Sequence, residues 1–217
     1  MIASLAGATK THNALRVPTR IGGFGGIEGL TRFLRAESIR AVIDATHPFA
    51  AQMSANAMRA CAKTSIPLLR LERPNWEAQD GGDWHDVEDA KRAPELLPHG
   101  ARVFLTVGAR WEAPFAARHD LWCLRRRIEP PLSDPFESGA VTLGRPPFAL
   151  GDEITLLRDH RITHLVTKNS GGPSRTKLDA AQQLAIPIIM IARPTPPATE
   201  CVETPAQAVQ WLERNGL

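Results

Sequence analysis

The sequence contains little of what disulfide-bonded, zinc-binding and membrane proteins require. Its three cysteines, Cys61, Cys123 and Cys201, lie far apart and form no CxxC pair, so neither a disulfide framework nor a zinc site is indicated. No apolar run approaches the roughly 18 residues of a membrane-spanning helix. The N-terminus has no cationic region followed by an apolar one, as a secretion signal would. We therefore expect a cytoplasmic protein that has no metal centre and no membrane partner.

Strong charge of one sign is also missing, which argues against nucleic acid as a partner. The net charge is only +3, and the one basic run beside aromatic residues is WCLRRR at 122–127. The catalytic patterns GxSxG and HExxH and the P-loop are absent. A chain of 217 residues with 43% hydrophobic residues forms one large or two small globular domains. Its weak positive charge suits an anionic small molecule.

Apolar runs typical of strands alternate with helix-period segments along most of the chain. After an N-terminal strand, the expected strands are 41–46, 66–71, 101–108, 121–128, 163–167 and 187–192. The expected helices are 26–39, a helix starting just after Pro48 and reaching 64, 150–162, 177–186 and 204–216, the last capped by Thr204. The Pro-rich segment 130–147 is expected to be a long loop. This alternation predicts an α/β fold with parallel sheets.

The stretch 72–86, rich in Pro, Gly and Trp, interrupts the alternation and is interpreted as the crossing between two domains. We therefore predict two small doubly wound domains, at 1–98 and 99–217. In such sheets, ligands bind beyond the carboxyl ends of the strands.

Two loops with glycine or polar residues follow strands in the first domain. The loop 20–26 exposes backbone N–H groups that are able to approach a phosphate or ribose, although its spacing is not GxGxxG and a tight turn is the alternative. In the loop 44–50, Asp44, Thr46 and His47 offer hydrogen bonds to a ligand. The alternative for His47 is a capping or structural role.

A third such loop follows a strand of the second domain. TKNSGG at 167–172 offers a cation, an amide, a hydroxyl and a close backbone approach, which suits an anion or ribose. The alternative is a turn with a solvated lysine.

Six motifs, in this order, resemble the precorrin-6A reductase family of cobalamin biosynthesis: GGFGG, VIDATHPFA, IPLLRLERPNW, FLTVG, LVTKNSGG and KLDAAQQLAIPIIMIARP. The resemblance spans nearly all of the chain. It implies two Rossmann-like domains with a cleft between them. It also implies NADPH as hydride donor and the reduction of one carbon–carbon double bond of precorrin-6A, a tetrapyrrole with many carboxylates, to precorrin-6B.

The resemblance also suggests site residues. The cofactor-binding set is Ser4, Lys10, Gly22, Gly23, Gly25, Thr46, His47, Pro48, Asn169, Ser170, Gly171 and Gly172, with Lys10 placed to select the 2′-phosphate of NADPH. His47 and Lys168 are the catalytic candidates, as proton donor or electrostatic partner, with water as the alternative donor. Arg70, Arg73 and Arg125 are the candidates for binding substrate carboxylates.

The family begins with a strand and a GGT-type turn into a helix, whereas MIASLAGATK resembles its second strand. The resemblance therefore implies two unpaired strand edges in the first sheet. Two alternatives to the family activity remain. One is a same-fold reductase for another substrate, such as cobalt-precorrin-6A. The other is a noncatalytic protein that binds a nucleotide or a tetrapyrrole. No oligomeric state is predicted.

Overall fold

Both parts of the protein are built from parallel β-sheets covered by helices. This computed structural model describes residues 1–7, 15–78 and 82–217. All neighbouring strands run parallel, which confirms the predicted α/β class. Within these residues, no helix is both long and apolar enough to cross a membrane.

The chain crosses from one compact unit to another and then returns. Unit 1 comprises Met1–Glu72 and Thr195–Leu217, and unit 2 comprises Arg73–Pro194. These boundaries differ from the expected division at 98/99. The reason is strand pairing, because β5 (Trp84–Val87) pairs with β10 of unit 2 and β11 (Cys201–Val202) pairs with β4 of unit 1.

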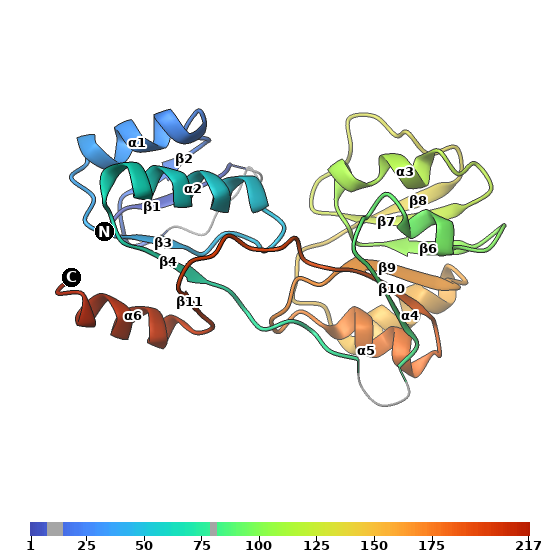
Figure 1. Ribbon diagram of the computed structural model, residues 1–217. Coiled ribbons are helices and arrows are strands. Elements are labelled where there is room, and N and C mark those ends of the chain that lie inside the picture. Colours follow the sequence, from blue (N-terminus) through green and yellow to red (C-terminus); the bar gives the residue numbers. More distant parts are fainter. Residues whose placement is uncertain (8–14, 79–81) are drawn as a thin grey trace. The chain divides into compact units, whose positions relative to one another are not determined.

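Unit 1 places two helices on one side of its strands and one on the other (Figure 1). Its elements are β1 (Ala3–Leu5), β2 (Thr19–Ile21), α1 (Gly26–Ala36), β3 (Val42–Asp44), α2 (Ala51–Thr64), β4 (Leu68–Leu71), β11 and α6 (Pro205–Arg214). Helices α1 and α2 share a buried core that includes Leu30, Leu34 and Ala60, and the two leucines lie one turn apart on α1, as on the apolar face of an amphipathic helix. On the other side, Trp211 of α6 packs against Leu69 of β4.

The strands of unit 1 form two separate sheets. One contains β1 and β2, and the other has the order β11-β4-β3. Among the described residues β1 and β3 do not pair with each other, as the resemblance implied. Ile43 on the outer edge of β3 is 37% exposed.

Unit 2 contains one six-stranded sheet with the order β5-β10-β9-β6-β7-β8. Its remaining elements are η1 (Ala93–Leu96), β6 (Arg102–Leu105), η2 (Ala109–Trp111), α3 (Ala113–Ala116), β7 (Trp122–Arg127), β8 (Gly139–Leu143), α4 (Leu150–Asp159), β9 (His164–Lys168), α5 (Thr176–Gln183) and β10 (Ile188–Ile191). From the central strand β6 the chain winds outward first through β7 and β8 and then through β9 and β10. This is the doubly wound arrangement, with its switch point between β6 and β9.

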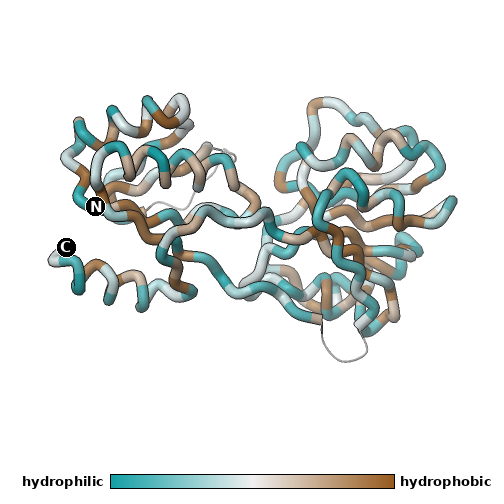
Figure 2. Tube along the Cα trace, in the orientation of Figure 1, coloured by the Kyte–Doolittle hydropathy of each residue, from teal (hydrophilic) through white to brown (hydrophobic). Residues whose placement is uncertain are grey.

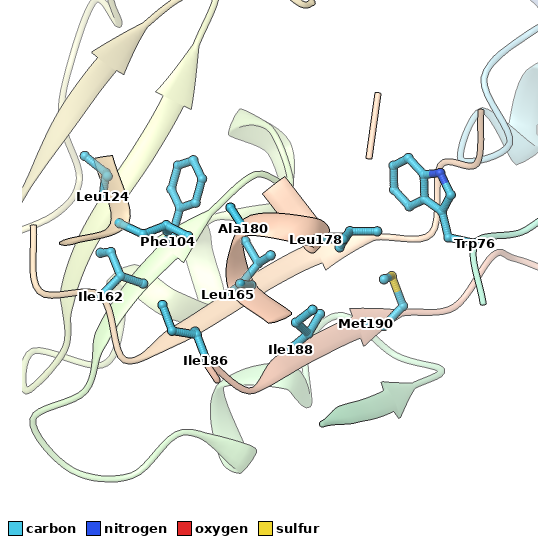
Figure 3. Packing of buried hydrophobic residues seen from close by; sticks show 12 residues of the cluster. Trp76, Phe104, Leu124, Ile162, Leu165, Leu178, Ala180, Ile186, Ile188 and Met190 are labelled. Carbon is cyan, nitrogen blue, oxygen red and sulfur yellow. The ribbon is translucent and has the colours of Figure 1, made fainter. Parts of the chain in front are cut away.

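The core of unit 2 lies on both faces of this sheet. Figure 3 shows Leu165, Ile188 and Met190 of the strands gathered with Leu178 of α5, and Trp76 at one end of the cluster. The alternating residues Val103, Leu105, Val166, Ile189 and Ile191 are buried on the opposite face. The strands are accordingly the most hydrophobic stretches of this unit (Figure 2).

The predicted start of α2 and the predicted loop 130–147 need correction, and the predicted cap of α6 is confirmed. Helix α2 begins at Ala51 rather than just after Pro48, because a turn closed by the Ala50 N–H and the His47 carbonyl (2.7 Å) precedes it. The segment 130–147 contains β8 and is not one long loop. Thr204 caps α6 in a capping box with Gln207, as expected for a threonine followed three residues later by glutamine.

Candidate functional site

The predicted site residues follow the carboxyl ends of three strands, as expected. Gly22, Gly23 and Gly25 follow β2, Thr46, His47 and Pro48 follow β3, and Lys168–Gly172 end β9 and continue from it. Ser4 lies on β1 and is exposed. Lys10 lies outside the described residues.

The glycine loop between β2 and α1 has an ordered backbone and open space beside it. Arg20 donates hydrogen bonds to the carbonyls of Gly22 (2.5 Å) and Gly23 (2.6 Å), and Gly22 and Gly25 have φ values of 111° and 76°. A Cβ added at Gly22, Gly23 or Gly25 would meet nothing within 4 Å. Helix α1 begins directly after this loop and has no side-chain cap. The first N–H groups of a helix suit an anion.

The loop after β3 uses much of its polar capacity internally. The Asp44 Oδ1 atom accepts hydrogen bonds from the Thr46 backbone N–H (3.1 Å) and from the Thr46 hydroxyl (2.6 Å). The His47 Nδ1 atom accepts from the Phe49 N–H (3.2 Å), so this nitrogen stabilises the turn before α2. The second carboxylate oxygen of Asp44 is buried, and within the described part of the chain it has no hydrogen-bond partner.

Lys168 lies at the topological switch point of unit 2. Its strand β9 is adjacent to β6, and the Thr106 N–H donates to the Val166 carbonyl (3.0 Å) where the two strands end. Burial, and then the charge of Arg110 in the segment after β6, lowers the pKa of Lys168 from 10.5 to about 8. The ammonium group is therefore charged at neutral pH but gives up a proton more readily than an exposed lysine.

The residues after Lys168 mainly contact the segment with which the chain enters unit 2. The Asn169 side chain accepts from the Trp76 N–H (2.8 Å) and donates to the Trp76 carbonyl (2.9 Å). The Trp76 indole N–H donates to the Gly172 carbonyl (2.7 Å). These contacts give the loop a structural role that the sequence did not predict.

Two of the three candidate substrate-binding arginines are bound by carboxylates of the protein. Arg125 is 1% exposed, and both of its Nη atoms contact Asp134. Arg70 is 5% exposed and forms an ion pair with Glu72. A buried guanidinium needs such a partner, so neither side chain is presented to a substrate. Arg73 is exposed beside Gly172, and among the described residues none forms an ion pair with it.

Strand β7 shows why sequence alone did not identify Asp134 as the partner of Arg125. Arg125 and Arg127 share one face of the strand, because side chains alternate along a strand. The three consecutive arginines contact Asp134, Glu153 and Glu112, respectively, which lie 9, 27 and 15 residues away in the sequence. The tertiary fold supplies these partners, and the local pattern carries no signal of them.

The sequence did not indicate three residues that the structure brings to the loop after β9. Arg110 reaches it from the segment after β6, and Arg193 from the segment after β10. Trp76 lies in the Pro-rich stretch that was interpreted only as a crossing. Arg110 follows β6 and Arg193 follows β10, the two strands beside β9 in the sheet. This position in the sequence was the signal that could have identified both residues.

Known proteins similar to this chain share one description. The family model described as "Precorrin-6x reductase CbiJ/CobK" matches residues 1–213. "Precorrin-6A reductase" of Rhodococcus erythropolis is 47% identical over 214 residues, which cover 97% of this chain and 86% of that protein. "Precorrin-6A reductase" of Rhodobacter capsulatus is 44% identical over 216 residues, which cover 98% of this chain and 86% of that protein. The solved structure "CobK precorrin-6A reductase" has a TM-score of 0.94 and 43% identity, over 99% of this chain and 87% of that chain.

Proposed function

Because this chain belongs to the precorrin-6x reductase family, we propose that it reduces one ring carbon–carbon double bond of precorrin-6A to give precorrin-6B. The observation that carries the proposal is the 47% identity, over 97% of the chain, to a relative named "Precorrin-6A reductase". NADPH, when bound, would supply the hydride. The protein itself must hold the nucleotide and macrocycle, exclude water and deliver a proton.

The loops of unit 1 fit a dinucleotide phosphate. The open space beside Gly22, Gly23 and Gly25 lets a phosphate approach the uncapped start of α1. Ser4 lies on β1, and Thr46, His47 and Pro48 follow β3, and we retain these four residues as candidate nucleotide contacts of unit 1. In unit 2, Ser170 remains a candidate by itself. For Asn169, Gly171 and Gly172, contact with the entering segment is the role that we favour.

Lys168 is the proton donor in this proposal. It lies at the switch point, where ligands of doubly wound sheets bind, and the pKa of about 8 suits a group that donates a proton near neutral pH. His47 is less suited because its Nδ1 atom holds the turn before α2. The exposed arginines Arg73 and Arg110, one on each side of Lys168 in the fold, are the candidates for the substrate carboxylates.

We expect kcat/KM to be at least about tenfold higher with NADPH than with NADH. The 2′-phosphate gains a charge-assisted hydrogen bond from Lys10, which contributes about 1.5 to 3 kcal/mol. Lys10→Ala should bring the two values closer together, whereas Lys91→Ala, at an exposed lysine of unit 2, should leave the ratio unchanged. Equal values in the unaltered protein would refute the assignment of NADPH.

Comparison of metal-free and cobalt-containing precorrin-6A tests the substrate. The relatives named for the metal-free compound are 38% to 47% identical to this chain, whereas a relative named "Cobalt-precorrin-6A reductase", from Synechocystis, is 32% identical. We therefore expect the higher kcat/KM with metal-free precorrin-6A. A higher value with the cobalt form would assign the chain to the other substrate, and no turnover of either form would exclude the proposed reaction.

A further inference from the structure

The chain enters unit 2 at Arg73 and leaves it at Pro194. Both of these segments contact the loop that follows β9. The entering segment is Arg73–Trp76, and the leaving segment contains Arg193. The same loop carries Lys168 at its start, so the contacts of the two segments bear on the position of that side chain.

Asn169 binds the entering segment as a strand would. Its side-chain oxygen and nitrogen pair with the N–H and the carbonyl of Trp76 at 2.8 Å and 2.9 Å. These two bonds satisfy both backbone groups of one residue, and the indole N–H of the same residue bonds to the Gly172 carbonyl. The Trp76 side chain is 7% exposed and belongs to the main core, while the Lys177 ammonium group lies 4.4 Å from its ring centroid. Trp76 is therefore held by hydrogen bonds, a cation–π contact and packing.

Arg193 ties three pieces of backbone together. Its Nε atom donates to the Asn169 carbonyl (2.8 Å), and its Nη atoms donate to the carbonyls of Arg73 (2.7 Å) and Pro74 (3.1 Å). One planar guanidinium thus joins the leaving segment, the loop and the entering segment. A lysine has no such fork of donors.

The glycines of the loop allow this close approach. Gly171 has a φ of 65°, and a Cβ there would lie 2.2 Å from the Pro74 carbonyl oxygen. A Cβ at Gly172 would lie 2.8 Å from Cδ of Arg73. The loop and the entering segment are therefore in direct backbone contact, which an alanine at position 171 would break.

We propose that Asn169 and Arg193 are positioning residues of the reductase, which bind the entering segment Arg73–Trp76 and thereby fix the loop that carries Lys168. The reductase role rests on the proposed function, but the fixing of Lys168 can be measured without turnover. Arg110, from the segment after β6, carries a charge that lowers the pKa of Lys168. Arg193 contacts the neighbouring residue Asn169 rather than Lys168 in the hydrogen bonds described above.

Arg193→Met tests this proposal because it keeps an unbranched side chain and removes every donor. We expect kcat to fall about tenfold, the loss of a charge-assisted contact, while KM for NADPH changes less than about twofold. Lys168 should become more hydrated, so its pKa, measured from the pH dependence of its labelling by an amine reagent, should rise above about 8. Amide exchange at Trp76 should also become faster. Arg92→Met, at an exposed arginine of the same unit, is the matched control and should change none of these quantities.

Two further variants distinguish a specific effect on Lys168 from unfolding of the protein. Asn169→Leu removes both hydrogen bonds to Trp76 without adding a charge beside Lys168, and should reproduce the kcat and labelling effects. Arg193→Lys should not rescue them. Faster exchange at Trp76 with wild-type kcat and an unchanged pKa of Lys168 would show that the contacts serve stability alone and would overturn the proposal. If the wild-type protein turns over no precorrin-6A, the reductase assignment fails, and the labelling of Lys168 still decides whether Arg193 fixes it.

Discussion

Lys168→Ala is expected to lower kcat at least tenfold and to remove the alkaline decline of the kcat–pH profile. A general acid must be protonated to act, so activity carried by a group with a pKa of about 8 is constant below that pH and falls above it. Without the ammonium group, proton delivery depends on water, and factors of about 10² to 10⁴ are typical for the loss of such a catalyst. The measurement is steady-state kcat from pH 6 to about 10 with both variants.

Lys168→Arg separates proton donation from charge. Arginine keeps the positive charge but does not release its proton in this range, so we expect it to be nearly as slow as the alanine variant. Recovery of wild-type kcat by Lys168→Arg would show that Lys168 acts only as a charge. Lys91→Ala is the matched control at an exposed lysine. An unchanged kcat in Lys168→Ala would exclude Lys168 from the mechanism.

Lys177→Met is expected to stabilise the protein at neutral pH by up to about 2 to 3 kcal/mol. Burial is the main cause that lowers the pKa of Lys177 from 10.5 to about 8, and Arg126 lowers it further, against the opposing charges of Glu153 and Asp179. Each pKa unit corresponds to about 1.4 kcal/mol. Methionine removes this charge, together with its hydrogen bond to the Ser174 carbonyl (3.2 Å), and keeps a contact with the Trp76 ring, since thioethers pack well on aromatic faces.

The same shift predicts how stability depends on pH. Between about pH 8 and 10.5 the unfolded chain binds more protons at Lys177 than the folded protein does, so the contribution of Lys177 to the free energy of unfolding should rise with pH across this window. Lys168, with a pKa of about 8, adds to this rise, and the raised pKa values of Cys61 and Cys123 oppose it above about pH 9, so Lys177 is measured as the difference between the wild-type protein and a variant. Urea unfolding at pH 7, 8, 9 and 10 measures it. The stabilisation by Lys177→Met should shrink as the pH rises from 7 to 10, and Lys91→Met should show no such trend, whereas a pH-independent difference between Lys177→Met and the wild-type protein would contradict the lowered pKa of Lys177.

The sequence predicted those strands that contain a clear apolar run. The runs around β4, β6, β9 and β10 are mainly apolar, and β7 is preceded by an apolar leucine and begins WCL, so the local pattern is sufficient. Strand β5 was missed because its sequence, WHDV, is largely polar, and only pairing with the distant β10 makes it a strand. Strand β8 was missed because prolines surround it. The division into units depended on β5 and β11, and so it could not be read from the order of elements.

The candidate site was predictable to a similar extent. The α/β pattern predicts that the polar loops follow the carboxyl ends of parallel strands. Lys168 does lie at the carboxyl end of a strand, β9. What each side chain contacts does not follow from that pattern. Asn169 was predicted to bind a ligand, but its side chain binds Trp76, which lies 93 residues away. Arg125 was predicted to bind a substrate carboxylate, but it binds Asp134. Long-range partners of this kind appear only in the folded protein.

Transfer of deuterium from labelled NADPH to precorrin-6A is the most direct test of the proposed reaction. The purified chain is incubated with metal-free precorrin-6A and NADPH that carries deuterium at the transferable position, and the macrocycle is analysed by mass spectrometry. We predict a reduced macrocycle with one deuterium from the nucleotide and one proton from the solvent, formed as fast as the nucleotide is oxidised. A macrocycle recovered unchanged, although the protein binds both compounds, would contradict the assignment and identify a noncatalytic binding protein.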